Sequence, residues 1–143
     1  MEPAKKLFPA SLIERATLRG NEYAWRIEDI PTVIEAARAA NLVNIGGQLQ
    51  FRITNGGTCE CYWVNVDTYK DVSKGLPWPE RVTLTATSAL RQFHRLVEKF
   101  DFIAEGRQAF AQHLLAFEAQ GGDLNETLCF VWYVKSEQAA ESP

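Results

Sequence analysis

The sequence predicts a single α+β domain, in which a mainly antiparallel sheet of four or five strands packs against helices. The length of 143 residues suits one hydrophobic core. Some segments alternate between polar and apolar residues, as strands do, and others show the spacing of amphipathic helices. The two kinds of segment are expected to form two packed layers, a sheet and a layer of helices. Asn55-Gly56-Gly57 separates two alternating segments and predicts an antiparallel hairpin between them.

The first elements are predicted from capping residues and periodicity. Residues 11–14 (SLIE) form a capping-box pattern that predicts a short helix, and Gly20 is placed to end it. Residues 22–27 alternate between polar and apolar side chains and predict a half-buried strand. Asp29 is expected to cap the next helix, with Pro31 in the first turn, where a missing N–H costs nothing. The apolar stripe of that helix is Ile30, Val33, Ile34, Ala37 and Leu42.

The predicted hairpin can take two registers. Gly46-Gly47 is expected to break the chain before one strand, residues 48–54, and the other strand spans residues 58–66. A two-residue turn would direct Glu60 into the core, whereas a three-residue turn ending in a left-handed glycine pairs Arg52 with Glu60 on the other face. We prefer the second register, because it keeps Glu60 out of the core. The residues that then face the core are Leu49, Phe51, Ile53, Cys59, Cys61 and Trp63.

The second half of the chain is expected to hold a loop, a strand, two helices and a last strand. Residues 67–80 predict a long polar loop, and long loops often carry function. Residues 81–86 (RVTLTA) alternate and are rich in β-branched side chains, so they predict a fourth strand. Helices are expected over residues 87–100 and 101–121, the second one capped by its first residue, an aspartate. Residues 127–135 are apolar on both faces and predict a central strand.

The expected organisation is an N-terminal extension with a short helix at 1–20, an α+β domain at 21–135 and a disordered tail at 136–143. The N-terminus lacks the apolar core and the cleavage pattern of an export signal. Three cysteines are an odd number, and a chain of this length folds without disulfides. These features favour reduced thiols and a cytoplasmic location.

Charge excludes two classes of partner. The formal net charge is −3 and the isoelectric point is near 5.4, whereas nucleic-acid binders and proteins bound to anionic membranes carry a basic excess. No apolar run approaches the ~18 residues of a membrane span. We therefore expect neither nucleic acid nor a membrane as a partner.

The cysteines, histidines and tryptophans are interpreted first as structural residues. Cys59 and Cys61 are spaced Cys-x-Cys, and with Cys129 they lack the second pair that a zinc site needs. His94 and His113 lie in different segments with no motif that supplies a nucleophile or an orienting group. We therefore expect no metal and no cofactor, and the sequence favours a protein without catalytic activity over an enzyme. The tryptophans expected in the core are Trp25, Trp63 and Trp132.

One face of the predicted sheet is a candidate binding surface. In the preferred register it collects polar and aromatic side chains, of the kinds enriched at protein interfaces. The 67–80 loop would add an exposed tryptophan beside it. The candidate partner-binding residues are Arg52, Glu60, Tyr62, Gln50 and Trp78.

These features favour a small cytoplasmic protein that binds a protein partner through this sheet face and the 67–80 loop. The most concrete version is an acidic inhibitor of a basic enzyme or toxin, because opposite net charge speeds association. In size and charge the chain resembles bacterial immunity proteins that neutralise a cognate toxin, and this resemblance assigns no site residues. One alternative is a small-molecule-binding protein or enzyme with a pocket between the sheet and the helices near His94 or His113. Another is a homodimer that pairs exposed strands.

Overall fold

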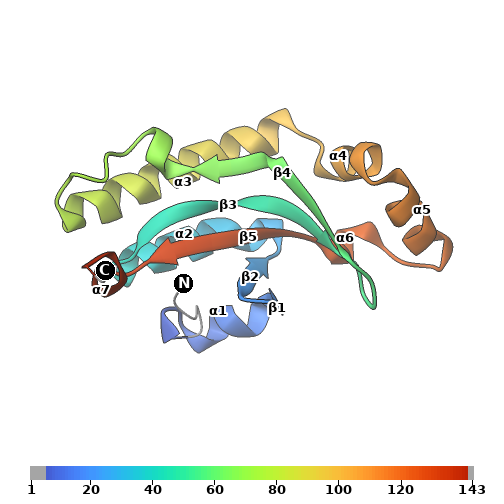
Figure 1. The fold of residues 1–143 in the computed structure, drawn as a ribbon, viewed down its shortest axis with the longest axis horizontal. Helices are drawn as coiled ribbons and strands as arrows, with labels where there is room; N and C mark the ends of the chain where they lie inside the picture. Colours follow the sequence, from blue (N-terminus) through green and yellow to red (C-terminus); the bar gives the residue numbers. More distant parts are fainter. Residues whose placement is uncertain (1–5, 142–143) are drawn as a thin grey trace.

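The computed structural model describes residues 6–141, and it describes the side chains of residues 6–140. The chain forms one five-stranded antiparallel sheet in the order β1-β2-β5-β3-β4, so the predicted α+β class is confirmed (Figure 1). The strands are β1 (Thr17–Arg19), β2 (Glu22–Trp25), β3 (Val43–Arg52), β4 (Thr58–Asp67) and β5 (Leu128–Lys135). The α-helices are α1 (Ala10–Arg15), α2 (Ile30–Ala39), α3 (Trp78–Lys99), α4 (Phe102–Ala109), α5 (Ala111–Ala119), α6 (Leu124–Thr127) and α7 (Glu137–Glu141).

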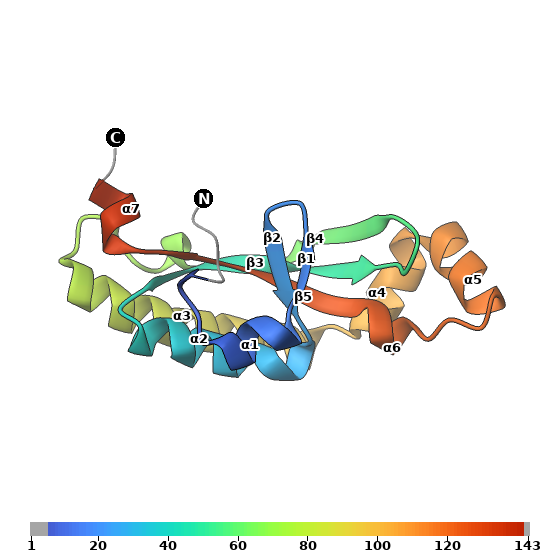
Figure 2. The same ribbon diagram turned by 90° about the horizontal axis from the view of Figure 1, so that it is seen from below.

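The molecule has two layers and one projection. Helices α1, α2 and α3 lie on one side of the sheet, and the β1–β2 hairpin rises from the other side (Figure 2). Only Ala24 and Trp25 of β2 pair with β5, opposite Val131 and Phe130, so the rest of the hairpin is free to leave the plane of the sheet. The face away from the helices is therefore partly covered by this hairpin.

The core lies between the sheet and the helices. As predicted, β5 is the central strand, with β2 on one side and β3 on the other. The stripe predicted for α2 is buried in full, and so are the core-facing residues Leu49 and Phe51 of β3. The segment predicted as an N-terminal extension contributes Phe8 and Leu12 to the same core. Its Leu12 carbonyl also accepts a hydrogen bond of 2.8 Å from the Trp25 indole.

The β3–β4 hairpin keeps the predicted faces but not the predicted pairs. Cys61 pairs with Leu49 on the core side, and Glu60 stays out of the core, as expected. Arg52 pairs with Thr58 rather than with Glu60, whose partner is Gln50. The register differs because residues 53–57, and not a three-residue turn, connect the strands.

Gly46 and Gly47 do not break the chain, contrary to the prediction, but lie within β3. A Cβ atom on Gly46 would come within 2.0 Å of the Val66 carbonyl oxygen, and one on Gly47 within 1.6 Å of the Val131 carbonyl oxygen. Gly46 also adopts a φ of 138°. Glycine is needed here because the two neighbouring strands approach the β3 backbone closely, which is a role that glycine plays in sheets.

Helix α3 replaces the strand predicted over residues 81–86. The helix starts at Trp78, before the predicted strand, with Pro79 in its first turn. Its buried positions are three and four residues apart and face the sheet and α2. The burial of this helical stripe outweighs the preference of Val and Thr for strands. These buried residues are Val82, Thr85, Ala86, Ala89 and Phe93.

Three of the predicted helix caps are wrong, and one is confirmed. Helix α1 begins at Ala10 without a side-chain cap, so Ser11 forms no capping box. Gly20 turns the β1–β2 hairpin at a φ of 60° instead of ending a helix. Asp29 precedes α2 without capping it, because its buried carboxylate pairs with Arg15. Asp101 does cap α4, accepting a hydrogen bond from the Ala104 amide.

Two segments toward the C-terminus also differ from expectation. The single helix predicted over 101–121 is divided into α4 and α5 at Phe110, whose φ of −129° is not helical. Within the tail predicted as disordered, 136–143, the structure places helix α7 over Glu137–Glu141, and residues 142 and 143 lie outside the described residues.

Candidate functional site

The predicted binding face is largely covered. Gln50 and Arg52 point to the face away from the helices, as the alternation predicts, but they are only 1% and 6% exposed. The β1–β2 hairpin accounts for this burial, since it stands over that face and hydrogen-bonds to Arg52 (Figure 2). The prediction that Arg52 and Gln50 meet solvent is therefore wrong. It failed because β1 was not predicted as a strand.

Arg52 instead ties the hairpin to the sheet. Its Nη1 donates to the Thr17 carbonyl oxygen at 2.8 Å, and its Nη2 donates to the Glu22 carbonyl oxygen at 3.0 Å. Its Nε donates to Oε1 of Gln50 at 3.1 Å, and the Gln50 amide donates in turn to Glu60 at 3.1 Å. Desolvation by burial lowers the pKa of Arg52 below its ordinary value. These contacts make Arg52 a structural residue of this face.

Trp78 is buried as well, at 8% exposure, so it is not the exposed aromatic that the sequence predicted. Its indole donates to the Asn41 carbonyl oxygen at 2.9 Å, which anchors the start of α3. The loop before it is held against α3 through Asp71, which accepts hydrogen bonds from Ser88 and Arg91. These hydrogen bonds lower the pKa of Asp71. The 67–80 loop is therefore a tethered segment rather than an open binding loop.

Tyr62 and Trp63 are the aromatic residues of β4 that do meet solvent. Tyr62 is 68% exposed, as predicted, and Trp63 is 41% exposed, which corrects its assignment to the core. The cause is a bulge: Leu49 pairs with Cys61, but the preceding residue, Gln48, pairs with Asn65. The residues between Cys61 and Asn65 have no partners in β3. The alternation of buried and exposed side chains along β4 therefore shifts by one residue there.

The two rings form a fixed pair, which we call the aromatic edge. They meet edge to face, with centroids 5.5 Å apart and an interplanar angle of 82°. The Asn65 side chain donates to the Tyr62 carbonyl oxygen at 2.9 Å, and the Trp63 indole donates to Glu105 of α4 at 3.1 Å. The Trp63 side chain is therefore held by a neighbouring helix and the Tyr62 ring packs against it, which lowers the entropic cost of binding.

Trp63 also separates two hollows on the surface. A hollow of about 400 Å³ lies toward α4, between Trp63 and residues Glu105, Gln108 and Ala109. The second hollow, of about 310 Å³, lies toward α3. Its lining carries three cationic side chains and no carboxylate. The lining residues are Trp63, Asn65, Lys70, Gln92, Arg95, Leu96, Lys99 and Phe100.

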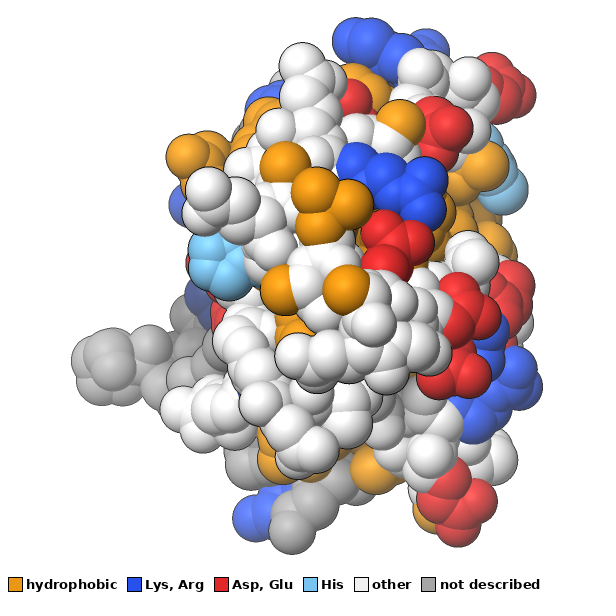
Figure 3. Space-filling view, turned by 90° about the vertical axis from the view of Figure 1, so that its right-hand side faces the viewer, with side chains coloured by type: hydrophobic (Ala, Val, Ile, Leu, Met, Phe, Trp, Pro, Cys, Tyr) orange, Lys and Arg blue, Asp and Glu red, His pale blue; other side chains and the backbone are white. Residues whose placement is uncertain are grey.

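At the end of the molecule formed by α4, α5 and the β3–β4 turn, exposed hydrophobic side chains do not gather into a patch (Figure 3). Leu115 on α5 is 62% exposed. Figure 3 shows, however, that hydrophobic side chains on this side are scattered among acidic, basic and neutral ones. Isolated exposed leucines of this kind are ordinary on protein surfaces.

The cysteines and histidines show no sign of a chemical site. Burial raises the pKa of the Cys61 thiol to about 12 and that of Cys129 to about 11, so both stay protonated near neutral pH. Among the described residues, no group of three or more His, Cys, Asp or Glu side chains could hold a metal ion. His94 and His113 are exposed on α3 and α5, and neither lines the hollows beside Trp63.

The sequence of β4 does contain a pattern that indicates the exposure of Trp63, although a regular alternation does not predict it. The buried residues of β4 are Cys59 and Cys61 at odd positions, and then Val64 and Val66 at even positions. This change of phase within one strand is what a bulge produces. Glu60 and Tyr62 are thus the two predicted binding residues that the structure leaves exposed.

In comparisons with known proteins, no protein-family model, curated protein or solved structure matches this α+β chain. Among the helices of residues 6–141, none has the length and apolar character needed to cross a membrane.

Proposed function

We propose that the protein binds a protein partner, without catalysis of its own, through the aromatic edge formed by Tyr62 and Trp63. The observation that carries this proposal is the exposure of two adjacent aromatic side chains, in contact with each other, on a strand at the edge of the sheet. Tyrosine and tryptophan are the residues most enriched among binding hot spots. The proposal moves the expected docking surface from the covered face of the sheet to its β4 edge.

The chemistry of the hollow toward α3 indicates the matching surface on the partner. Lys70, Arg95 and Lys99 surround the exposed face of Trp63 without a lining carboxylate. A partner segment that carries an apolar or aromatic side chain flanked by acidic residues complements this arrangement. Lysine and arginine at the rim contribute mainly to the association rate and to specificity, whereas the buried aromatic contributes most of the affinity.

The net charge and the local charge differ in sign. A formal net charge of −3 favours the approach of a basic partner, such as the basic enzyme or toxin of an inhibitor or immunity-like pair. The hollow itself is cationic. A basic partner with an acidic docking segment satisfies both observations, and this is the concrete form of the proposal.

The bulge also bears on self-association. Edge strands pair with one another when they are long and regular, and bulges disfavour such pairing. The unpaired residues between Cys61 and Asn65 interrupt the exposed edge of β4. A heterologous partner that covers the aromatic side chains therefore suits this edge better than a homodimer that continues the sheet.

The test is a quantitative affinity capture from the native cell extract. The wild-type chain is compared with the double variant Tyr62→Ser/Trp63→Ser, and with Leu115→Ser as the control. Leu115 is as exposed as Tyr62 but lies on α5. We expect at least one protein to be retained by the wild type and by the control, and lost with the double variant.

The affinity of the captured protein is then measured with purified components. Loss of a hot spot costs about 2 kcal/mol or more, so the double variant should bind about thirty-fold more weakly or worse. Equal capture and equal affinity for the wild type and the double variant would refute docking through the aromatic edge. Circular dichroism of each variant confirms that both remain folded.

A further inference from the structure

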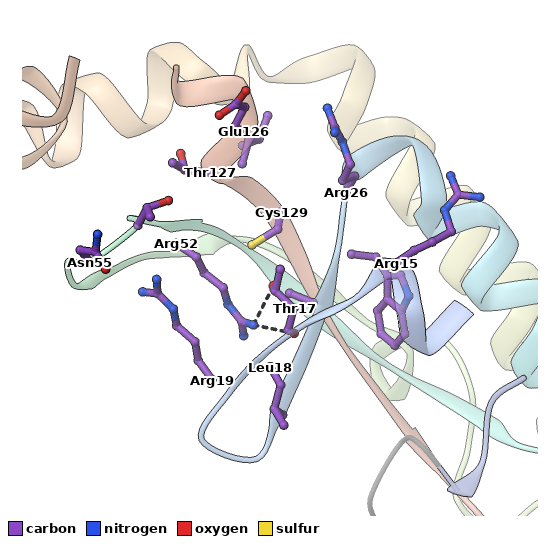
Figure 4. A pocket seen from close by; sticks show the side chains of 14 residues that line it. Arg15, Thr17, Leu18, Arg19, Arg26, Arg52, Asn55, Glu126, Thr127 and Cys129 are labelled. Atoms are coloured by element: carbon purple, nitrogen blue, oxygen red, sulfur yellow. Dashed lines mark hydrogen bonds between the residues drawn. The ribbon is translucent and has the colours of Figure 1, made fainter. Parts of the chain in front are cut away.

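A cavity of about 320 Å³ lies beside the base of the β1–β2 hairpin, away from the aromatic edge. Figure 4 shows its walls, which come from the end of α1, the hairpin, the β3–β4 turn and the start of β5. None of its lining residues lines the hollows beside Trp63. The lining residues are Arg15, Thr17, Leu18, Arg19, Ala24, Trp25, Arg26, Arg52, Thr54, Asn55, Glu126, Thr127, Leu128 and Cys129.

The charges around this cavity are unbalanced. Its lining holds four arginines and a single carboxylate, that of Glu126. Arg15 and Arg26 pair with Asp29 and Glu28, which do not line the cavity. The other two arginines, Arg19 and Arg52, form no ion pair among the described residues, and the hydrogen bonds they donate go to neutral acceptors.

Arg19 and Arg52 are also held in place. The Arg19 guanidinium donates to the Ile53 carbonyl oxygen at 2.6 Å and to the Gly57 carbonyl oxygen at 3.0 Å, which fixes it against the β3–β4 turn. Arg52 is fixed by Thr17, Gln50 and Glu22 as described above. Figure 4 shows the two side chains next to each other on one wall of the cavity.

Two like charges that are close and desolvated are costly. Burial is the main cause of the lowered pKa of Arg52, and the positive charge of Arg19 lowers it further, whereas the neighbouring Glu22 carboxylate acts in the opposite direction. Carbonyl acceptors satisfy N–H groups but leave the net positive charge in place. An anion in the cavity would neutralise this charge, and it would gain charge-assisted hydrogen bonds from guanidinium groups that are already ordered.

We propose that this cavity binds a small ligand that carries a carboxylate or phosphate group. Its volume admits a compact molecule rather than a polymer, and the planar guanidinium fork matches both kinds of oxyanion. The site is a binding site and not a nucleophilic one, because the Cys129 thiol that lines it has a pKa raised by burial to about 11.

The test is isothermal titration calorimetry with inorganic phosphate and with succinate, against sodium chloride at matched ionic strength. Two exposed arginines give a matched pair of variants. Arg26→Gln removes a cavity arginine that pairs with Glu28, and Arg38→Gln removes an arginine on α2 that pairs with Glu35. Both ion pairs are exposed and local, so both variants should fold.

We expect saturable binding of one or both oxyanions at one site, weakened about tenfold by Arg26→Gln and unchanged by Arg38→Gln. Phosphate alone, or succinate alone, would identify the class of ligand group. A third variant, Arg19→Lys, keeps the positive charge and removes the planar guanidinium, and it should weaken binding in the same way.

Two results would overturn the proposal. One is the absence of saturable heat for both oxyanions at millimolar concentration. The other is equal weakening by Arg26→Gln and Arg38→Gln, which would indicate general surface charge. Neither result bears on the aromatic edge, because Tyr62 and Trp63 are remote from the lining of the cavity.

Discussion

Arg52 shows how a polar residue on a strand can become structural. Its charge is brought out of water by a hairpin that joins the sheet through only two residue pairs. That arrangement is stable because the hydrogen bonds of Arg52 satisfy the Thr17 and Glu22 carbonyl oxygens of the same hairpin. A buried guanidinium without such acceptors would be strongly destabilising.

Replacing Arg52 should therefore destabilise the protein. Arg52→Ala removes several charge-assisted hydrogen bonds and leaves buried carbonyl groups unsatisfied, so the free energy of unfolding should fall by about 2–3 kcal/mol. Urea denaturation followed by circular dichroism measures this loss. Arg38→Ala, which removes an exposed arginine of α2, should change it by less than about 0.5 kcal/mol. Similar stability of both variants would show that the hairpin does not depend on Arg52.

At the scale of elements, the packing of α3 on β3 is the feature that the sequence predicted least well. The segment RVTLTA has the composition and alternation of a strand, and its helical stripe appears only when Ala89 and Phe93, beyond its end, are counted with it. Within the helix, the Thr85 hydroxyl donates to the Arg81 carbonyl oxygen at 2.6 Å. It also accepts a hydrogen bond of 3.1 Å from the Asn44 amide of β3. Thr85 therefore joins the two elements.

Substituting Thr85 tests this junction. Thr85→Val keeps the shape of the side chain but leaves the buried Asn44 N–H without its acceptor, which should cost about 1–3 kcal/mol. The control is Thr87→Val, because the exposed Thr87 hydroxyl bonds only to the Thr83 carbonyl oxygen of its own helix. Thermal and urea unfolding of both variants provide the comparison. Equal stability would argue against this contact between α3 and β3.

Other elements were predictable for a clear physical reason. Strand β5 is apolar on both faces because it lies between two strands, under the helices and beside the hairpin. The stripe of α2 shows the helical period without interruption. Strand β1 has three residues, too few to show a period, and the coverage of Arg52 depends on it. The prediction of the site failed mainly through this missing strand.

At the scale of the whole molecule, the aromatic edge and the arginine cavity lie in different regions of the fold. The first depends on a bulge in β4. The shift of the apolar positions at this bulge is present in the sequence, but a regular alternation does not predict it. The second is assembled from α1, the β1–β2 hairpin, β3 and β5, and its lining runs from Arg15 to Cys129 in the chain. No local pattern predicts that these arginines line one cavity.

The docking proposal depends on Trp63 being the tryptophan that meets solvent. The chain has four tryptophans, and Trp25, Trp78 and Trp132 are buried. The most direct measurement is acrylamide quenching of tryptophan fluorescence in the wild type, in Trp63→Phe and in Trp78→Phe. The quenchable fraction should disappear in Trp63→Phe and persist in Trp78→Phe. A quenchable fraction that survives in Trp63→Phe and is lost in Trp78→Phe would contradict the account.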